Sequence, residues 1–344
     1  MSESVQAIPP FVDAPAPYVR RQAARPTARE WVRHTALFLL TALTSTIAGV
    51  VLFSPELPAP ALRLINWLDY VLYVPEYYLL TLTAYIQNAL AHPFLLTQGA
   101  MFAGALLLIL AAHESGHYVA CRRYGVDATL PFFIPAPPLI LAGTFGAFIK
   151  IKSPIPSRRA LFDIGVAGPL AGFVVALPVA VIGVLSLQPA HLSAGAGPII
   201  SFNDPLLFRL IAAASGVKLA DTGSNPFQMA AWIGLLVTSL NLLPVGQLDG
   251  GHATYAVFGP RLHKWLGRAA FIIMASLSVL GWFWHGSPSG FLYALLLAVM
   301  LRVRHPQAED NTPLDNKRLL VAVLTLLVFI LCFLPFPITI IWND

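Results

Sequence analysis

Long apolar runs separated by short polar and charged segments dominate the 344-residue sequence. A helix needs roughly 20 apolar residues to cross the hydrocarbon core of a membrane, so each run of about that length predicts a transmembrane helix. The runs are 35–54, 100–121, 161–187, 227–245, 268–285, 288–303 and 319–341. The pattern therefore predicts an all-α polytopic membrane protein with about seven transmembrane helices, in a range of roughly six to eight.

Composition and charge placement agree with this interpretation. The chain is 57% hydrophobic and only 11% charged, which is outside the range of ordinary soluble domains. With the N-terminus in the cytoplasm, all of the 21 Lys and Arg residues except Arg63, Arg209 and Lys218 fall on the cytoplasmic side. Membrane topology thus accounts for the net charge of +5, and no nucleic-acid partner is expected.

Three ionisable residues interrupt the second apolar run, which contains the sequence HESGH from His113 to His117. The i, i+4 spacing places both imidazoles on one helix face, close enough to share a metal ion, and Glu114 is the candidate base that activates the attacking water. Ionisable side chains inside a membrane helix are costly and indicate a functional site. The alternative is a buried network in which the three side chains only satisfy one another.

Two histidines leave a catalytic zinc site one protein ligand short. The fourth run ends at Pro244 and Gly246, and Asp249 follows at the same cytoplasmic end. His113, His117 and Asp249 therefore predict one Zn²⁺ per chain, although cobalt, iron or manganese would accept the same ligands. The alternative for Asp249 is a turn aspartate before two glycines.

Other polar and small residues extend this candidate site. Asn241 is a candidate donor to a substrate carbonyl or oxyanion, with helix–helix packing as the alternative. His252 is predicted to support the ligands without binding the metal. Gly168 and Gly172 predict a small-residue face on the third run that packs against the metal-bearing helices.

An alternation of apolar residues predicts a membrane-associated β-hairpin near 139–152. Gly143, Phe145 and Gly146 are the candidates for a strand whose free edge pairs with an unwound substrate. An amphipathic loop anchored by Lys150 and Lys152 is the alternative. Asp163, at the start of the third run, is expected to be structural or to pair with Arg158 or Arg159, and a role as a ligand is the alternative.

The combination of HESGH and the later NLLPVGQLDGG resembles the HExxH and NxxPxxxLDG motifs of the site-2 proteases, which are intramembrane zinc metalloproteases. The matching positions are His113, Glu114, His117, Asn241, Pro244, Leu248, Asp249 and Gly250. Residues 143–172 are similar to the branch that contains the plastid EGY-type proteases and bacterial relatives without a PDZ domain. The resemblance covers about 100–260 and implies a membrane-protein substrate, cut within or next to its transmembrane helix.

These observations predict four segments. They are a disordered basic cytoplasmic tail (1–34), an anchor helix and external interfacial segment (35–99), a catalytic metalloprotease core (100–260) and C-terminal transmembrane helices (261–344).

The predicted function is hydrolysis of a peptide bond in a transmembrane protein or peptide by zinc-activated water. A metal-ion transporter, or a non-catalytic membrane scaffold with the same fold, is the alternative. A transporter would carry polar residues at successive depths of several helices, whereas here they cluster in two. The predicted location is the lipid bilayer of a bacterial cytoplasmic membrane, with the active site in the cytoplasmic half. The sequence specifies neither the substrate nor the oligomeric state.

Overall fold

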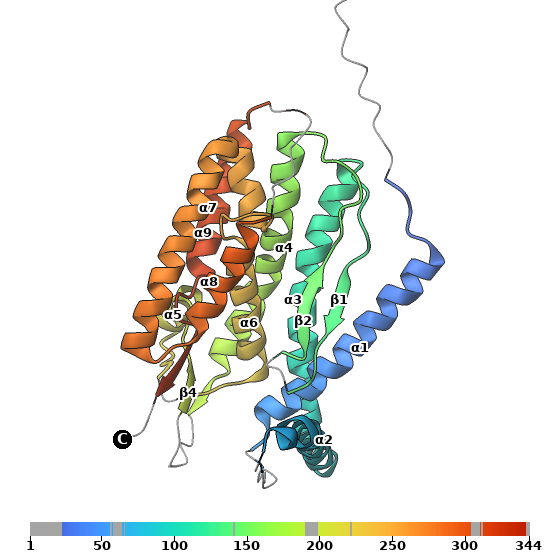
Figure 1. Cartoon of the computed structure of the whole chain (residues 1–344), viewed down its shortest axis with the longest axis vertical. Coiled ribbons are helices and arrows are strands. Elements are labelled where there is room, and N and C mark those ends of the chain that lie inside the picture. Colours follow the sequence, from blue (N-terminus) through green and yellow to red (C-terminus); the bar gives the residue numbers. More distant parts are fainter. Residues whose placement is uncertain are drawn as a thin grey trace, which may run out of the picture.

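The structure, a computed structural model, describes residues 23–55, 57, 64, 66–139, 142–189, 199–220, 222–303, 310 and 312–341. Figure 1 shows a bundle of helices, with α2 seen end-on because it crosses beneath the others. The helices are α1 (Ala28–Phe53), α2 (Trp67–Ala91), α3 (Pro93–Arg123), α4 (Arg158–Leu185), α5 (Leu206–Ser215), α6 (Pro226–Asn241), α7 (Asp249–His285), α8 (Ser289–Met300) and α9 (Asn316–Cys332). The strands are β1 (Phe132–Pro135), β2 (Thr144–Phe148), β3 (Gln188–Pro189), β4 (Ile199–Phe202), β5 (Thr222–Gly223) and β6 (Ile338–Ile341), which pair antiparallel as β1–β2, β3–β5 and β4–β6.

Four of the described helices, α1, α3, α4 and α7, are long and apolar enough to cross a membrane. The predicted number of seven is not confirmed, because the runs at 227–245, 288–303 and 319–341 form helices of 16, 12 and 17 residues. Helix α6 shows the reason. Most of its residues are buried inside the protein, and a helix that is apolar all round can be a core helix as well as a membrane span.

The first helix begins earlier than the apolar pattern predicts. Thr27 and Glu30 form a capping box, in which the Thr27 Oγ1 accepts from the Glu30 N–H at 3.2 Å and the Glu30 carboxylate accepts from the Thr27 N–H at 2.8 Å. The chain is therefore helical from Ala28, inside the segment predicted as a tail. Residues 1–22 of that segment lie outside the described residues.

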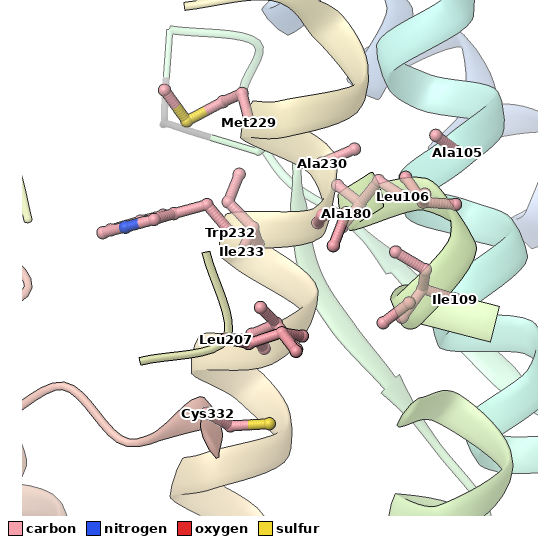
Figure 2. Close-up of a cluster of buried hydrophobic side chains, with 14 of the residues drawn as sticks. Ala105, Leu106, Ile109, Ala180, Leu207, Met229, Ala230, Trp232, Ile233 and Cys332 are labelled. Carbon is pink, nitrogen blue, oxygen red and sulfur yellow. The ribbon is translucent and has the colours of Figure 1, made fainter. Parts of the chain in front are cut away.

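The hydrophobic core lies among α3, α4 and α6. Figure 2 shows Leu106 and Ile109 of α3 facing Ala180 of α4 and Ala230 of α6. Trp232 is completely buried in the same cluster, and its indole N–H donates to the carbonyl oxygen of Asn203 at 2.8 Å. This core joins α3, which carries the two histidines and Glu114, to α6, which ends at Asn241, so the relative positions of these residues depend on its packing.

The predicted hairpin is present in a longer form. Strand β2 falls within 139–152, but its partner β1 begins at Phe132, before the predicted segment. Phe132 pairs with Phe148, and their rings stack with centroids 5.3 Å apart. The Thr144 hydroxyl also donates to the Ile134 carbonyl oxygen at 2.8 Å. The sequence pattern missed β1 because Pro135 interrupts it and a register irregularity follows Phe133.

Helix α7 contains a break at Gly259, whose φ of 81° and ψ of 176° are not helical. Pro260 follows and has no N–H to donate, which leaves carbonyl oxygens free in the preceding turn. Arg158 of α4 donates hydrogen bonds to two of these carbonyl oxygens, from its Nε to Ala256 O and from its Nη2 to Val257 O at 3.2 Å. The short first part of α7 is thereby fastened to the start of α4.

An ion pair links α9 to the ends of α3 and α4. The guanidinium of Arg318 donates to both oxygens of Asp163, at 2.9 and 2.7 Å, and also to the hydroxyl of Tyr124 at 3.1 Å. The Tyr124 hydroxyl donates to the same carboxylate. The prediction that Asp163 pairs with Arg158 or Arg159 is wrong. Its carboxylate instead forms a bidentate ion pair with Arg318, which lies 155 residues later in the chain.

We expect Arg318→Gln to destabilise the bundle by about 1–3 kcal/mol, because the half-buried Asp163 carboxylate loses its charged partner. The measurement is the midpoint of thermal unfolding in detergent. The control is Lys317→Gln, which removes an adjacent exposed charge. In an Asp163→Asn background the same Arg318 change should cost less, and equal costs in both backgrounds would contradict the pairing.

Candidate metal centre

Side chains from α3 and α7 converge on one point. His113 Nε2 and His117 Nε2 are 3.2 Å apart, and Asp249 Oδ2 lies 3.3 Å from the first and 3.2 Å from the second. The i, i+4 spacing on α3 gives both imidazoles the same direction. The structure thus brings together the three residues for which the sequence predicts a shared ion.

The chemistry of these three atoms fits a bound cation. The Nδ1–H of His117 donates to the Ile164 carbonyl oxygen at 2.7 Å, so the neutral ring carries a lone pair on Nε2. That lone pair faces a carboxylate oxygen of Asp249, which is also an acceptor, and only a proton or a metal ion between the two makes the contact favourable. Ligands bonded to one tetrahedral zinc at about 2.0–2.2 Å lie roughly 3.3 Å apart, close to the observed separations.

Glycines on α4 make room for the two imidazoles. A methyl group at Gly168 would overlap the His117 ring, and one at Gly172 would lie 3.1 Å from His113 Cβ. On the facing helix, a methyl group at Gly116 would overlap the backbone of Ala167. The predicted small-residue face is confirmed, and it brings α4 close enough for the Ile164 carbonyl to fix the tautomer and orientation of His117.

Asp249 lies on the first turn of α7, after a tight turn that follows the last residue of α6. Gly246 adopts a φ of 54° within that turn, a conformation that a residue with a side chain rarely adopts. A methyl group at Gly250 would overlap the carbonyl oxygen of Leu242, and one at Gly251 would overlap that of Gly246. These glycines allow α7 to begin directly against the turn, which places the Asp249 carboxylate at the histidines.

Two further polar residues lie beside the three ligands. The Asn241 Nδ2, at the end of α6, is 3.4 Å from His113 Nε2. Glu114 is 6% exposed, and Ile149, just after β2, lines the same cavity. A strand segment and the candidate base therefore meet at the same place.

A cavity of about 660 Å³ opens onto this cluster, a size typical of ligand-binding pockets. Its walls come from α3, α4, the segment that runs on from β2, and the turn before α7. The lining residues include His113, Glu114, His117, Ala147, Phe148, Ile149, Lys150, Ile151, Ile164, Asn241, Gln247, Leu248, Asp249 and His252.

The structure separates the predicted substrate-strand residues from this cavity. Gly143, Phe145 and Gly146 are not among its lining residues, whereas the residues from Ala147 to Ile151 are. Gly143 instead packs against α1, where its carbonyl oxygen accepts from the Thr44 hydroxyl at 2.7 Å. The substrate role of Gly143, Phe145 and Gly146 stays a prediction.

Sequence reasoning missed the backbone groups of the site. The Ile164 carbonyl and the backbone of Ile149 belong to apolar residues whose side chains carry no chemical signal. His252 does line the cavity, where a methyl group at Gly165 would lie 2.8 Å from its Cβ.

The fold and the site are those of a helical metal-binding protein with long apolar helices. Two of these helices carry the His/His/Asp cluster. The model of Peptidase family M50 matches residues 101–281, a range that contains all three candidate ligands. The chain belongs to this family, the site-2 protease family of metallopeptidases, and it is a membrane protein.

Curated relatives agree with this assignment. The chain is 31% identical over 254 residues to a probable zinc metalloprotease, EGY2, of Arabidopsis thaliana, covering 70% of this chain and 43% of the relative. It is 32% identical over 246 residues to EGY1 of the same plant, covering 70% of this chain and 42% of the relative. It is 28% identical over 340 residues to EGY1 of Oryza sativa subsp. japonica, covering 95% of this chain and 54% of the relative. The names of all three describe them as chloroplastic, and the chain spans about half the length of these relatives.

Proposed function

We propose that this protein is a zinc metalloendopeptidase that hydrolyses a peptide bond in or next to a transmembrane segment of a membrane-protein substrate. The observation that carries the proposal is the triangle of acceptor atoms from His113, His117 and Asp249, with Glu114 in the same cavity. One zinc ion per chain, bound by these three side chains, would supply Lewis acidity toward water and the scissile carbonyl.

The remaining chemistry is assigned to two side chains. Glu114 removes a proton from the attacking water, whose oxygen bonds to the carbonyl carbon, and delivers that proton to the amide nitrogen as the C–N bond breaks. The products are one carboxylic acid, which ionises, and one amine. Asn241 can donate its amide N–H to the substrate carbonyl oxygen as negative charge develops there. Its amide nitrogen lies beside His113, next to the place where that carbonyl must bind.

The substrate must be extended before cleavage, because a peptide bond inside a helix is shielded from attack. Residues 147–151, which are the end of β2 and the three residues after it, line the cavity, so we propose that the substrate pairs with this segment. Gly143, Phe145 and Gly146 would then support the strand from outside the cavity. Pairing would replace the backbone hydrogen bonds that the substrate loses when its helix unwinds.

The proposal includes an orientation. Lys and Arg residues gather at the end of α3 and the starts of α4 and α9, which lie at the upper end of the bundle in Figure 1. By the positive-inside rule this end faces the cytoplasm, with the N-terminus on the same side and the active site in the cytoplasmic half. We propose a bacterial cytoplasmic membrane as the location.

The test is metal content and cleavage of a generic transmembrane reporter by the purified chain in detergent. We expect about one zinc per chain, loss of cleavage on treatment with a chelator, and recovery when zinc is added back. His117→Ala should abolish both metal binding and cleavage. His92→Ala is the matched control, because it removes an exposed imidazole at the other end of the same helix.

Different results separate the parts of the proposal. Full metal content in His117→Ala would show that the ion binds elsewhere. Zinc binding in wild type without cleavage of any transmembrane reporter would favour the non-catalytic scaffold, and release of metal across a vesicle membrane would favour the transporter.

A further inference from the structure

A second cavity, of about 550 Å³, lies apart from the metal centre. It is formed by α7 and by the residues that follow α8, and it shares no lining residue with the cavity that contains Glu114. Its lining residues are Gly246, Tyr255, Pro260, His263, Lys264, Gly267, Arg268, Leu301, Arg302 and Val303.

Three cations line this cavity. Lys264 and Arg268 are four residues apart on α7 and share a face, and Arg302 approaches from the end of α8. Among the described residues, no carboxylate lines the cavity, and none of these three cations forms an ion pair. Like charges at this spacing repel one another, so the arrangement favours a bound anion.

The surface beside the cavity is apolar. Ile272 continues the face of Lys264 and Arg268 along α7 at the next i+4 position, and Val279 follows after two further turns; these side chains are 61% and 47% exposed. Trp265 is 67% exposed beside the cavity, with the Arg268 guanidinium 5.7 Å from its ring centroid. An exposed tryptophan between charged and apolar surfaces is typical of the membrane–water interface.

From these contacts we propose that the cavity binds a phosphate group, supplied by the headgroup of an anionic phospholipid. Lys264, Arg268 and Arg302 contact the phosphate, and an acyl chain lies along Ile272 and Val279. Arginine and lysine both suit phosphate oxygens, and basic pockets between helices on the cytoplasmic side of a membrane bind such headgroups. A free phosphate would contact the three cations and leave Ile272 and Val279 uncovered.

The test measures lipid retained by the full chain. Purified protein is mixed with detergent micelles that contain equal parts of phosphatidylglycerol and phosphatidylcholine, isolated again, and analysed by mass spectrometry of the bound lipid. We expect wild type to retain phosphatidylglycerol in preference. The triple variant Lys264→Gln, Arg268→Gln, Arg302→Gln should lower the ratio of retained phosphatidylglycerol to phosphatidylcholine by about tenfold or more.

The matched control is Arg29→Gln, Arg123→Gln, Lys317→Gln, which removes three exposed charges outside the cavity. It should retain phosphatidylglycerol as wild type does. An equal loss in both triple variants, or no preference in wild type, would overturn the site. Size-exclusion elution and thermal unfolding of each variant identify any loss of fold, and single substitutions replace the triple variant in that case.

A separate arm distinguishes the two sources of phosphate. Inorganic phosphate is added to the lipid-loaded protein and, separately, to delipidated protein during thermal unfolding. We expect the lipid to stay bound and the delipidated protein to gain little stability. Displacement of the lipid together with stabilisation by inorganic phosphate would assign the cavity to free phosphate and overturn the lipid as its ligand.

Discussion

Gly168→Ala will empty the metal centre and abolish cleavage, although it adds only one methyl group. The added Cβ would overlap the His117 ring, and the ring cannot turn away without breaking the hydrogen bond from its Nδ1–H to Ile164 O. Retreat of α4 would open the close contacts that it makes with α3 at Gly116 and Gly172, and the packing there would be lost. Loss of the partner that orients a metal-binding histidine typically costs about tenfold to a hundredfold in metal affinity, and here the ligand itself is displaced.

The measurement is the zinc content of each purified variant after dialysis against a weak chelator. Gly104→Ala is the control, since nothing lies within 4 Å of its added methyl group on the same helix as the histidines. Gly172→Ala should have an intermediate effect, because its methyl group would lie 3.1 Å from His113 Cβ. Wild-type zinc content in Gly168→Ala would contradict the proposal that α4 positions His117.

Glu114→Gln will keep the metal and lose the reaction. Glutamine has nearly the shape of glutamate, so the three ligands stay in place, but a neutral amide cannot take a proton from water. The side chain is 6% exposed, so bulk buffer is a poor substitute for the missing base. The loss of a positioned general base costs about 10²–10⁴-fold in rate.

Two measurements on the same preparation test this prediction: zinc content and the rate of cleavage of the transmembrane reporter. Glu76→Gln is the control, because it removes an exposed carboxylate on α2. Cleavage at the wild-type rate would mean that another group accepts the proton. Loss of zinc would mean that Glu114 supports the ligands and does not act only as the base.

The metal cluster was accessible to sequence reasoning because each part has a local signature. An i, i+4 pair on a helix has only one relative orientation, so the spacing of His113 and His117 predicts their convergence. Asp249 required a second argument, namely that the charge distribution places the two apolar runs in the same direction across the membrane. The glycine spacing of α4 was equally visible, since a small-residue face predicts a close helix–helix contact.

Other features were not accessible, for physical reasons. The hydrogen bond from His117 to Ile164 O uses a backbone atom, which every residue has. The partner of Asp163 is Arg318, and no local pattern connects residues so far apart in the chain. The predicted number of seven spans is not confirmed, because an apolar run does not reveal whether it faces lipid or protein, and most residues of α6 are buried inside the protein.

The break at Gly259 has a consequence for how the protein responds to its bilayer. A long membrane helix adapts to a thicker or thinner hydrocarbon layer by tilting, and a straight α7 would carry such a tilt to Asp249 at its first turn. The break separates the two parts, and Arg158 fastens the short part to α4, which also holds His117 through Ile164 O. The long part of α7 can therefore change its tilt without carrying Asp249 directly with it, so we expect the metal centre to respond less to membrane thickness than it would on a straight helix.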